Sequence, residues 1–112
     1  MILVTGPLFA GKKEYIMKSM GLTEQEFAER ALWDVQDLAA ETSDLVELAD
    51  SLAEKEIVIA TEVGAGVVPV DAGERAFREA AGRLACLLAE RADVVIRVCC
   101  GLPQVLKGDW KC

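Results

Sequence analysis

The sequence predicts a small three-layer α/β domain with a short parallel sheet of about three strands flanked by helices. Three apolar runs rich in β-branched residues, at 1–5, 56–61 and 94–99, are typical of buried strands. The segments between them carry apolar residues at helical spacing, and strands separated by helices pair in parallel with helices on both faces. With 112 residues, 53 % of them hydrophobic, the chain forms one domain over 1–112.

The first half begins with the run MILVT, which ends at Gly6-Pro7 and therefore reads as a strand entering a turn. A helix is expected from near Gly11 to Gly21. The next four residues, 23–26, are Thr-Glu-Gln-Glu, a capping-box pattern. Apolar residues then follow at helical spacing, namely Phe27, Ala31, Val35 and Leu38. We therefore expect one amphipathic helix over 24–40.

The second half repeats the pattern. A helix is expected over 44–54, then the strand 56–61, a loop over 62–72, and a long helix that begins after Asp71 and ends near Ala92. The last strand, 94–99, ends before Gly101. Because free cysteine packs as a small hydrophobe, Cys99-Cys100 is interpreted as the end of a buried strand. The polar tail that carries Trp110 is expected to be mobile.

Composition excludes several classes of function. The net charge of −7 argues against a nucleic-acid partner. No window approaches a membrane span, and four cysteines without C-x-x-C spacing or any histidine argue against a zinc site. Reduced thiols indicate a cytoplasmic protein. The modest core of so short a chain favours a homo-oligomer, a dimer or trimer.

The stretch GPLFAGKK, at 6–13, fits the first seven positions of the phosphate-binding loop G-x-x-x-x-G-K-[ST]. A position between a strand and a helix lets backbone N–H groups and the helix N-terminus bind phosphate, with Lys12 reaching the terminal groups. The domain is thus predicted to be a P-loop-type nucleotide-binding domain. The predicted cofactor-binding residues of the loop are Gly6, Pro7, Leu8, Phe9, Ala10, Gly11, Lys12 and Lys13. The alternative is an ordinary glycine turn with two solvated lysines.

Lys13 stands where the motif has a Ser or Thr that binds Mg²⁺. Three outcomes stay open. Lys13 turns outward and another carboxylate holds the metal, or its charge replaces the metal, or catalysis is lost while an anion site persists.

The segment TEVGAGVVP, at 61–69, follows the second strand at the end of the sheet where ligands of α/β proteins bind. Glu62 is the predicted second catalytic residue beside Lys12, acting on a metal-bound water or as a base toward a hydroxyl acceptor. Gly64 and Gly66 would allow the backbone to approach a ligand. The alternative is a surface loop with a solvated Glu62.

Two blocks, 1–16 and 57–107, resemble the bifunctional adenosylcobinamide kinase / adenosylcobinamide-phosphate guanylyltransferase family of cobalamin biosynthesis. The matching stretches are the glycine loop, EVGAGVVP at 62–69, Phe77-Arg78, Gly82-Arg83, Ala92-Asp93 and Gly101-Leu102-Pro103. The resemblance implies a GTP or ATP donor and adenosylcobinamide as the acceptor. It also implies guanylyl transfer through a histidine, and trimeric assembly.

The chain departs from that pattern in three ways. It has no histidine, it is shorter between the two blocks, and it carries Lys13 in the loop. Asp34 could be taken for a second-motif aspartate, but it lies in the predicted helix 24–40, where an aspartate is usually a solvated surface residue.

These observations favour an adenosylcobinamide kinase-like phosphotransferase without guanylyltransferase activity. One alternative is a non-catalytic protein that binds a nucleotide or a corrinoid. A third is a structural subunit whose acidic helices over 24–54 dock a partner. Magnesium dependence of nucleotide binding would separate the first two.

Overall fold

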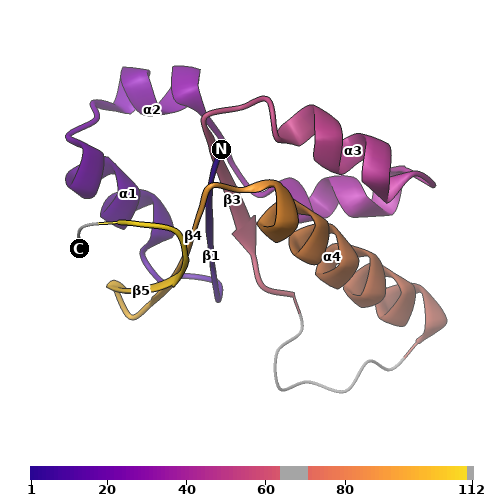
Figure 1. Ribbon diagram of the computed structural model, residues 1–112. Coiled ribbons are helices and arrows are strands. Elements are labelled where there is room, and N and C mark those ends of the chain that lie inside the picture. The colour runs from indigo at the N-terminus through magenta and orange to yellow at the C-terminus, as the bar shows by residue number, and fades with distance from the viewer. Residues whose placement is uncertain (64–70, 111–112) are drawn as a thin grey trace.

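The computed structural model describes residues 1–63 and 71–110 and shows a central sheet between two layers of helices (Figure 1). Helices α1 and α2 lie on one side of the strands, and α3 and α4 lie on the other. The elements in chain order are β1 (Ile2–Gly6), α1 (Lys12–Met20), α2 (Glu24–Arg30), β2 (Ala31–Leu32), the 3-10 helix η1 (Val35–Glu41), α3 (Leu45–Leu52), β3 (Ile57–Thr61), α4 (Ala72–Arg91), β4 (Val94–Cys99) and β5 (Leu102–Lys107).

The sheet has five strands in the order β2-β3-β1-β4-β5. The three predicted strands form its parallel centre, β3-β1-β4, so the predicted fold class is confirmed. The predicted number of strands is wrong. A two-residue strand, β2, adds a parallel edge beside β3, and β5 adds an antiparallel edge beside β4.

Side chains of the central strands alternate between two cores, as strand geometry requires. Leu3, Val58 and Val95 pack against the side of η1, α3 and α4. Val4, Ile59 and Ile96 pack with Ile16 and Phe27 on the side of α1 and α2. All five residues of β3 are buried, which agrees with its run of apolar residues up to Thr61.

The predicted helix over 24–40 is wrong beyond Arg30. Its capping box is present, since Thr23 Oγ1 accepts from the Glu26 N–H at 3.2 Å and Glu26 Oε1 accepts from the Thr23 N–H at 3.1 Å. Phe27, however, packs in one core and Val35 in the other. Because these cores lie on opposite faces of the sheet, the chain crosses the sheet edge through β2 rather than continuing as one helix.

The other predicted helices are confirmed within a few residues. Asp44 Oδ1 accepts from the Glu47 N–H at 3.0 Å at the start of α3. Asp71 Oδ1 accepts from the Glu74 N–H at 2.7 Å at the start of α4. These side chains satisfy N–H groups that a helix terminus leaves without an intrahelical partner. Most of the predicted loop, residues 64–70, lies outside the described residues.

Two expectations about the C-terminal part are wrong. The Trp110 indole N–H donates to the Tyr15 hydroxyl at 2.8 Å, which ties the tail to α1. Cys99 and Cys100 are exposed rather than buried. Cys99 is the last residue of β4 and lies on the strand face opposite Val98, where its side chain is exposed.

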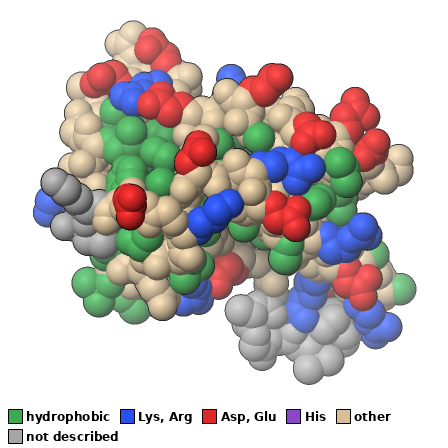
Figure 2. Space-filling view, viewed as in Figure 1, with side chains coloured by type: hydrophobic (Ala, Val, Ile, Leu, Met, Phe, Trp, Pro, Cys, Tyr) green, Lys and Arg blue, Asp and Glu red, His purple; other side chains and the backbone are tan. Residues whose placement is uncertain are grey.

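Among the described residues, no helix is long and apolar enough to cross a membrane. Acidic and basic side chains are interspersed along the upper edge of the molecule, so the net negative charge is not gathered in one block there (Figure 2).

Candidate functional site

The glycine loop connects β1 to α1 at the carboxyl end of the parallel strands (Figure 1). Gly6 has a φ of 150°, and a Cβ there would lie 2.1 Å from the Val98 carbonyl oxygen, so only glycine fits. Gly11, with a φ of 86°, is the N-cap of α1. Between them, Leu8 and Phe9 are 65 % and 95 % exposed. The loop is therefore anchored at both glycines and presents an apolar tip to solvent.

Lys12 is the first residue of α1, and only 5 % of it is exposed. Its ammonium donates to the Pro7 carbonyl at 2.7 Å, so the side chain folds back across the loop. Burial lowers the pKa of Lys12 from its ordinary value, and the charges of Asp34, Glu62 and Glu14 act against that shift. Lys12 is thus a buried residue at the start of a helix, within electrostatic reach of three carboxylates.

Lys13 lies toward α2. Its Nζ is 2.9 Å from a carboxylate oxygen of Glu24 and 5.4 Å from the centre of the Phe27 ring. The same ring meets Trp33 edge-on, with ring centres 6.0 Å apart. In this arrangement the Lys13 ammonium ties α1 to α2.

Glu62 directly follows β3, and its backbone N–H donates to the Gly6 carbonyl at 2.9 Å. Its carboxylate accepts from Arg97 Nε at 3.1 Å and from the terminal guanidinium nitrogen at 2.8 Å. Glu62 is the main cause that raises the pKa of Arg97. Arg97 was not predicted as a site residue, because an arginine in an apolar strand gives no motif.

Asp34 is the candidate that the sequence interpretation considered and set aside. It was assigned to a helix surface, but it follows β2 in a left-handed conformation with a φ of 54°. Its Oδ1 accepts from the Thr61 hydroxyl at 2.8 Å, and the Thr61 N–H donates to the buried Gln36 side chain at 2.9 Å. Asp34 and Lys12 are close enough for its charge to act on the Lys12 pKa.

The signal that could have identified Asp34 is a short apolar run, Ala31-Leu32-Trp33, that ends at an acidic residue. Two of these residues form β2, and Asp34 lies just beyond the carboxyl end of that strand. A run of this length is too short for strand periodicity to be recognised.

A cavity of about 290 Å³ lies between this end of the sheet and α4. Its polar lining comes from Thr5, Gln36, Thr61, Glu62 and Arg78. Among the described residues, Glu62 is the predicted site residue that lines this cavity. Glu62 also contacts the loop at Gly6 and pairs with Arg97, and Asp34 reaches the same edge of the sheet through Thr61. The predicted Gly64 and Gly66 lie outside the described residues.

The described residues contain no group of three or more Cys, Asp or Glu side chains placed to hold a metal ion. Any metal at this site would therefore depend on fewer protein ligands and on oxygen atoms of a bound substrate. Mg²⁺ is commonly held in that way, by one or two carboxylates together with phosphates and water.

Comparison with known proteins gives two matches. Residues 16–106 match the family model for cobinamide kinase / cobinamide phosphate guanyltransferase. The chain is also 37 % identical over 76 residues to the bifunctional adenosylcobalamin biosynthesis protein CobP of Pseudomonas aeruginosa. That match covers 68 % of this chain and 44 % of the relative.

The family match begins inside α1, after the glycine loop, and covers most of the remaining chain. It includes Asp34, Glu62 and Arg97, which come from three different strands or strand ends of the sheet. The chain therefore belongs to the cobinamide kinase / cobinamide phosphate guanyltransferase family.

Proposed function

We propose that this chain binds a nucleoside triphosphate, GTP or ATP, and acts as an adenosylcobinamide kinase-like phosphotransferase of the cobalamin pathway without guanylyltransferase activity. The observation that carries the proposal is the placement of Lys12. It is buried at the helix end of a glycine loop, among the charges of Asp34 and Glu62. The family match supports the pathway, and the relative's name links it to adenosylcobalamin biosynthesis.

In this proposal the phosphates lie along the loop, and the Lys12 ammonium donates to a phosphate oxygen instead of to a backbone carbonyl. In the structure this ammonium donates to the Pro7 carbonyl. A phosphate oxygen forms a stronger, charge-assisted hydrogen bond with an ammonium group than a carbonyl does. Lys12 would then stabilise the charge that develops on the transferred phosphoryl group, while the loop N–H groups position it.

The side chains at the site fit a magnesium ion held mainly by the substrate. Asp34 would hold the ion through its carboxylate, whose Oδ1 is oriented by the Thr61 hydroxyl. When bound, magnesium would neutralise charge on the phosphate oxygens. Lys13 takes no part in this arrangement, because its ammonium pairs with Glu24.

Guanylyl transfer is not proposed, because the family's second activity uses a histidine as the guanylyl carrier and this chain has none. Glu62 is proposed to act on the acceptor hydroxyl. In the structure both of its carboxylate oxygens accept from Arg97, so the acceptor must draw Glu62 out of that ion pair.

That ion pair is also the specific observation that favours the second candidate, a non-catalytic protein that binds a nucleotide or a corrinoid. A carboxylate held on both oxygens by a guanidinium is poorly placed to accept a proton. The Lys13 substitution in the loop agrees with this candidate as well.

We further propose a homo-oligomer, a dimer or a trimer, in the cytoplasm. Large apolar side chains on the loop and on β5, namely Leu8, Phe9, Leu102 and Leu106, are more than half exposed and could be covered by a second copy.

The test is calorimetric titration of GTP and ATP, first with Mg²⁺ and then with EDTA. Lys12→Ala is the test variant, and Lys18→Ala, an exposed lysine of the same helix, is the matched control. Magnesium-dependent binding that only Lys12→Ala abolishes supports the proposal, and phosphate transfer to adenosylcobinamide is then assayed. Binding without transfer selects the second candidate. No binding, or equal loss in both variants, contradicts both.

A further inference from the structure

The turn that joins β4 to β5 places a cysteine where the backbone disfavours it. Cys99 pairs with Leu102, so Cys100 and Gly101 form a two-residue hairpin loop. Their φ angles are 54° and 72°, the left-handed values of a type I′ turn. Such turns prefer Asn-Gly or Gly-Gly, since a side chain other than glycine or asparagine is strained there. Turn geometry does not account for a cysteine at this position.

Both thiols of the turn are open to solvent. Cys99, Cys100 and, on α4, Cys86 are free and exposed, although free cysteine is among the most buried residue types. Cys99 lies two residues from Arg97 on the same strand, so their side chains leave the same face of the sheet. The Cys99 side chain contributes, after Glu62, to raising the pKa of Arg97. Both thiols of the turn are therefore accessible to an oxidant in solution.

The same turn supports the glycine loop. The Gly101 N–H donates to the Ala10 carbonyl at 2.8 Å. A Cβ placed on Gly11 would lie 3.4 Å from the Gly101 Cα, so the two backbones are in close contact. A change in the backbone of the turn is therefore transmitted to the residues that immediately precede Lys12.

We propose that Cys99 and Cys100 form a vicinal dithiol that a hydroperoxide oxidises, and that this modification weakens anion binding at the glycine loop. The Cys99 thiolate attacks the peroxide, the O–O bond breaks, and Cys99 becomes a sulfenic acid while hydroxide or alkoxide leaves. The Cys100 thiol then attacks that sulfur and forms the S–S bond, and the sulfenic oxygen leaves as water. Two electrons pass from the two sulfur atoms to the peroxide.

Closing this bond must distort the turn. Consecutive Cα atoms are about 3.8 Å apart, whereas the Cα atoms of a disulfide are usually about 4.4–6.8 Å apart. The strain falls on Cys100 and Gly101 and loosens the bond from Gly101 to Ala10. A strained disulfide is easily reduced, which suits a transient modification in a reducing compartment.

The chemical step can be tested by peptide mapping of the intact protein after hydrogen peroxide treatment. Trypsin cleavage after Arg97 and Lys107 releases residues 98–107, which contain Cys99 and Cys100 and no other cysteine. We expect this peptide to become lighter by two hydrogen atoms and to recover its mass with dithiothreitol, before Cys86 reacts. Cys86→Ser is the matched control, and Cys100→Ser should stop Cys99 at the sulfenic acid. Equal reactivity of Cys86, or no link, would overturn the proposal.

The consequence for the loop is measured in two ways on the reduced and oxidised protein. Hydrogen exchange of residues 8–12 should accelerate on oxidation, and Cys100→Ser should abolish that response. Affinity for inorganic triphosphate should fall about tenfold, within the usual range of coupling between two sites. This second readout rests on the proposed function. If the reduced protein binds no triphosphate, the proposed function fails while the exchange measurement still tests the modification. A linked turn with unchanged loop exchange would contradict the coupling.

Discussion

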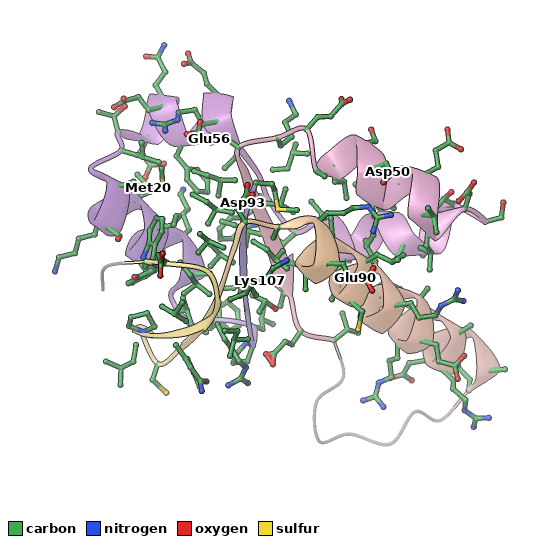
Figure 3. All side chains as sticks on the ribbon, viewed as in Figure 1. Met20, Asp50, Glu56, Glu90, Asp93 and Lys107 are labelled. Atoms are coloured by element: carbon green, nitrogen blue, oxygen red, sulfur yellow. The ribbon has the colours of Figure 1, made fainter. Side chains whose placement is uncertain are left out.

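The two ends of the parallel sheet are built differently. At the amino end, charges and backbone groups pair directly. The Met1 ammonium lies 2.8 Å from Asp93, and the Lys107 ammonium donates to the Ala89 and Glu90 carbonyls at 3.0 and 3.1 Å. Asp93, Lys107 and Glu90 are labelled in Figure 3, where they lie near the end of α4. Arg30 pairs with Glu56 at the same end.

At the carboxyl end the backbone itself is unusual. Within residues 1–63 and 71–110, the non-glycine residues with left-handed φ are Phe9, Asp34 and Cys100. Each follows the carboxyl end of a parallel strand. Such residues cost about 1–3 kcal/mol each and cluster at functional sites. The amino end therefore pairs its charged groups directly, while the carboxyl end keeps strained residues that stability alone would not select.

The strongest test of this contrast is Gly6→Ala. A Cβ at Gly6 would lie 2.1 Å from the Val98 carbonyl oxygen, and both atoms belong to the packed centre of the sheet. We expect the free energy of unfolding to fall by about 3 kcal/mol or more in urea denaturation. Gly21→Ala is the matched control, since Gly21 also has a positive φ but has open space around it. Gly21→Ala should lower the free energy of unfolding by about 1 kcal/mol, which is the cost of a non-glycine residue at a positive φ without any steric clash. Equal losses would show that the close contact at Gly6 is not limiting.

A smaller effect is expected for Asp34→Asn, which removes a charge but keeps an oxygen that can accept from Thr61. Magnesium-dependent binding of nucleoside triphosphate should weaken about tenfold, or about 1.4 kcal/mol, because one carboxylate is lost. Asp37→Asn, at an exposed position of η1, should leave binding unchanged. Calorimetry compares the three proteins, and unchanged binding in Asp34→Asn would place the metal elsewhere.

Cys100→Gly should have the opposite effect and raise the free energy of unfolding. Glycine adopts the φ of 54° without strain, and the expected gain is about 1 kcal/mol, reduced by the greater freedom of glycine in the unfolded chain. Urea denaturation under reducing conditions measures it. Cys99→Ser, in ordinary strand geometry, should give no such gain. A loss in Cys100→Gly would mean that the thiol makes a contact on which the turn depends.

The smallest effect is expected at the amino end. The hydrogen bond from the Met1 ammonium lowers the pKa of Asp93 below its ordinary value of 3.8. A lowered carboxyl pKa contributes stability that is present above pH 3.8 and is lost as the pH falls through the folded-state value. Asp93→Asn should therefore lose less stability than the wild type between neutral pH and about pH 3, by a small margin because the pair is exposed. Parallel pH profiles in urea denaturation would contradict this.

The sequence predicted those parts of the fold that local physics decides. The buried runs of β1, β3 and β4 and the caps at Thr23 and Asp71 are readable because apolar runs and cap side chains act over a few residues. β2 was missed because its two residues become a strand only by pairing with β3, a contact that is distant in sequence. β5 was missed because its exposed residues carry no alternation of apolar and polar side chains.

The residues of the candidate site divide in the same way, into those that a local motif identifies and those that come together only on folding. The glycine loop is a continuous motif, so Gly6, Gly11 and Lys12 could be named in advance. Arg97 and the Cys100 turn could not be named, and Asp34 was considered but assigned to a helix surface, because each joins this edge only through the folding of separate strands. The prediction for Glu62 gave the correct place in the fold but not its ion pair with Arg97.

Because its indole N–H donates to the Tyr15 hydroxyl, Trp110 is an intrinsic fluorescence probe of helix α1. Tyr15 lies one turn into the helix that starts at Lys12, so the Trp110 indole senses the polarity and position of that helix. The other tryptophan, Trp33, contacts Phe27 and is about half exposed. Replacing Trp33 with phenylalanine would leave a single fluorophore whose emission follows the helix behind the glycine loop in real time, without any attached dye.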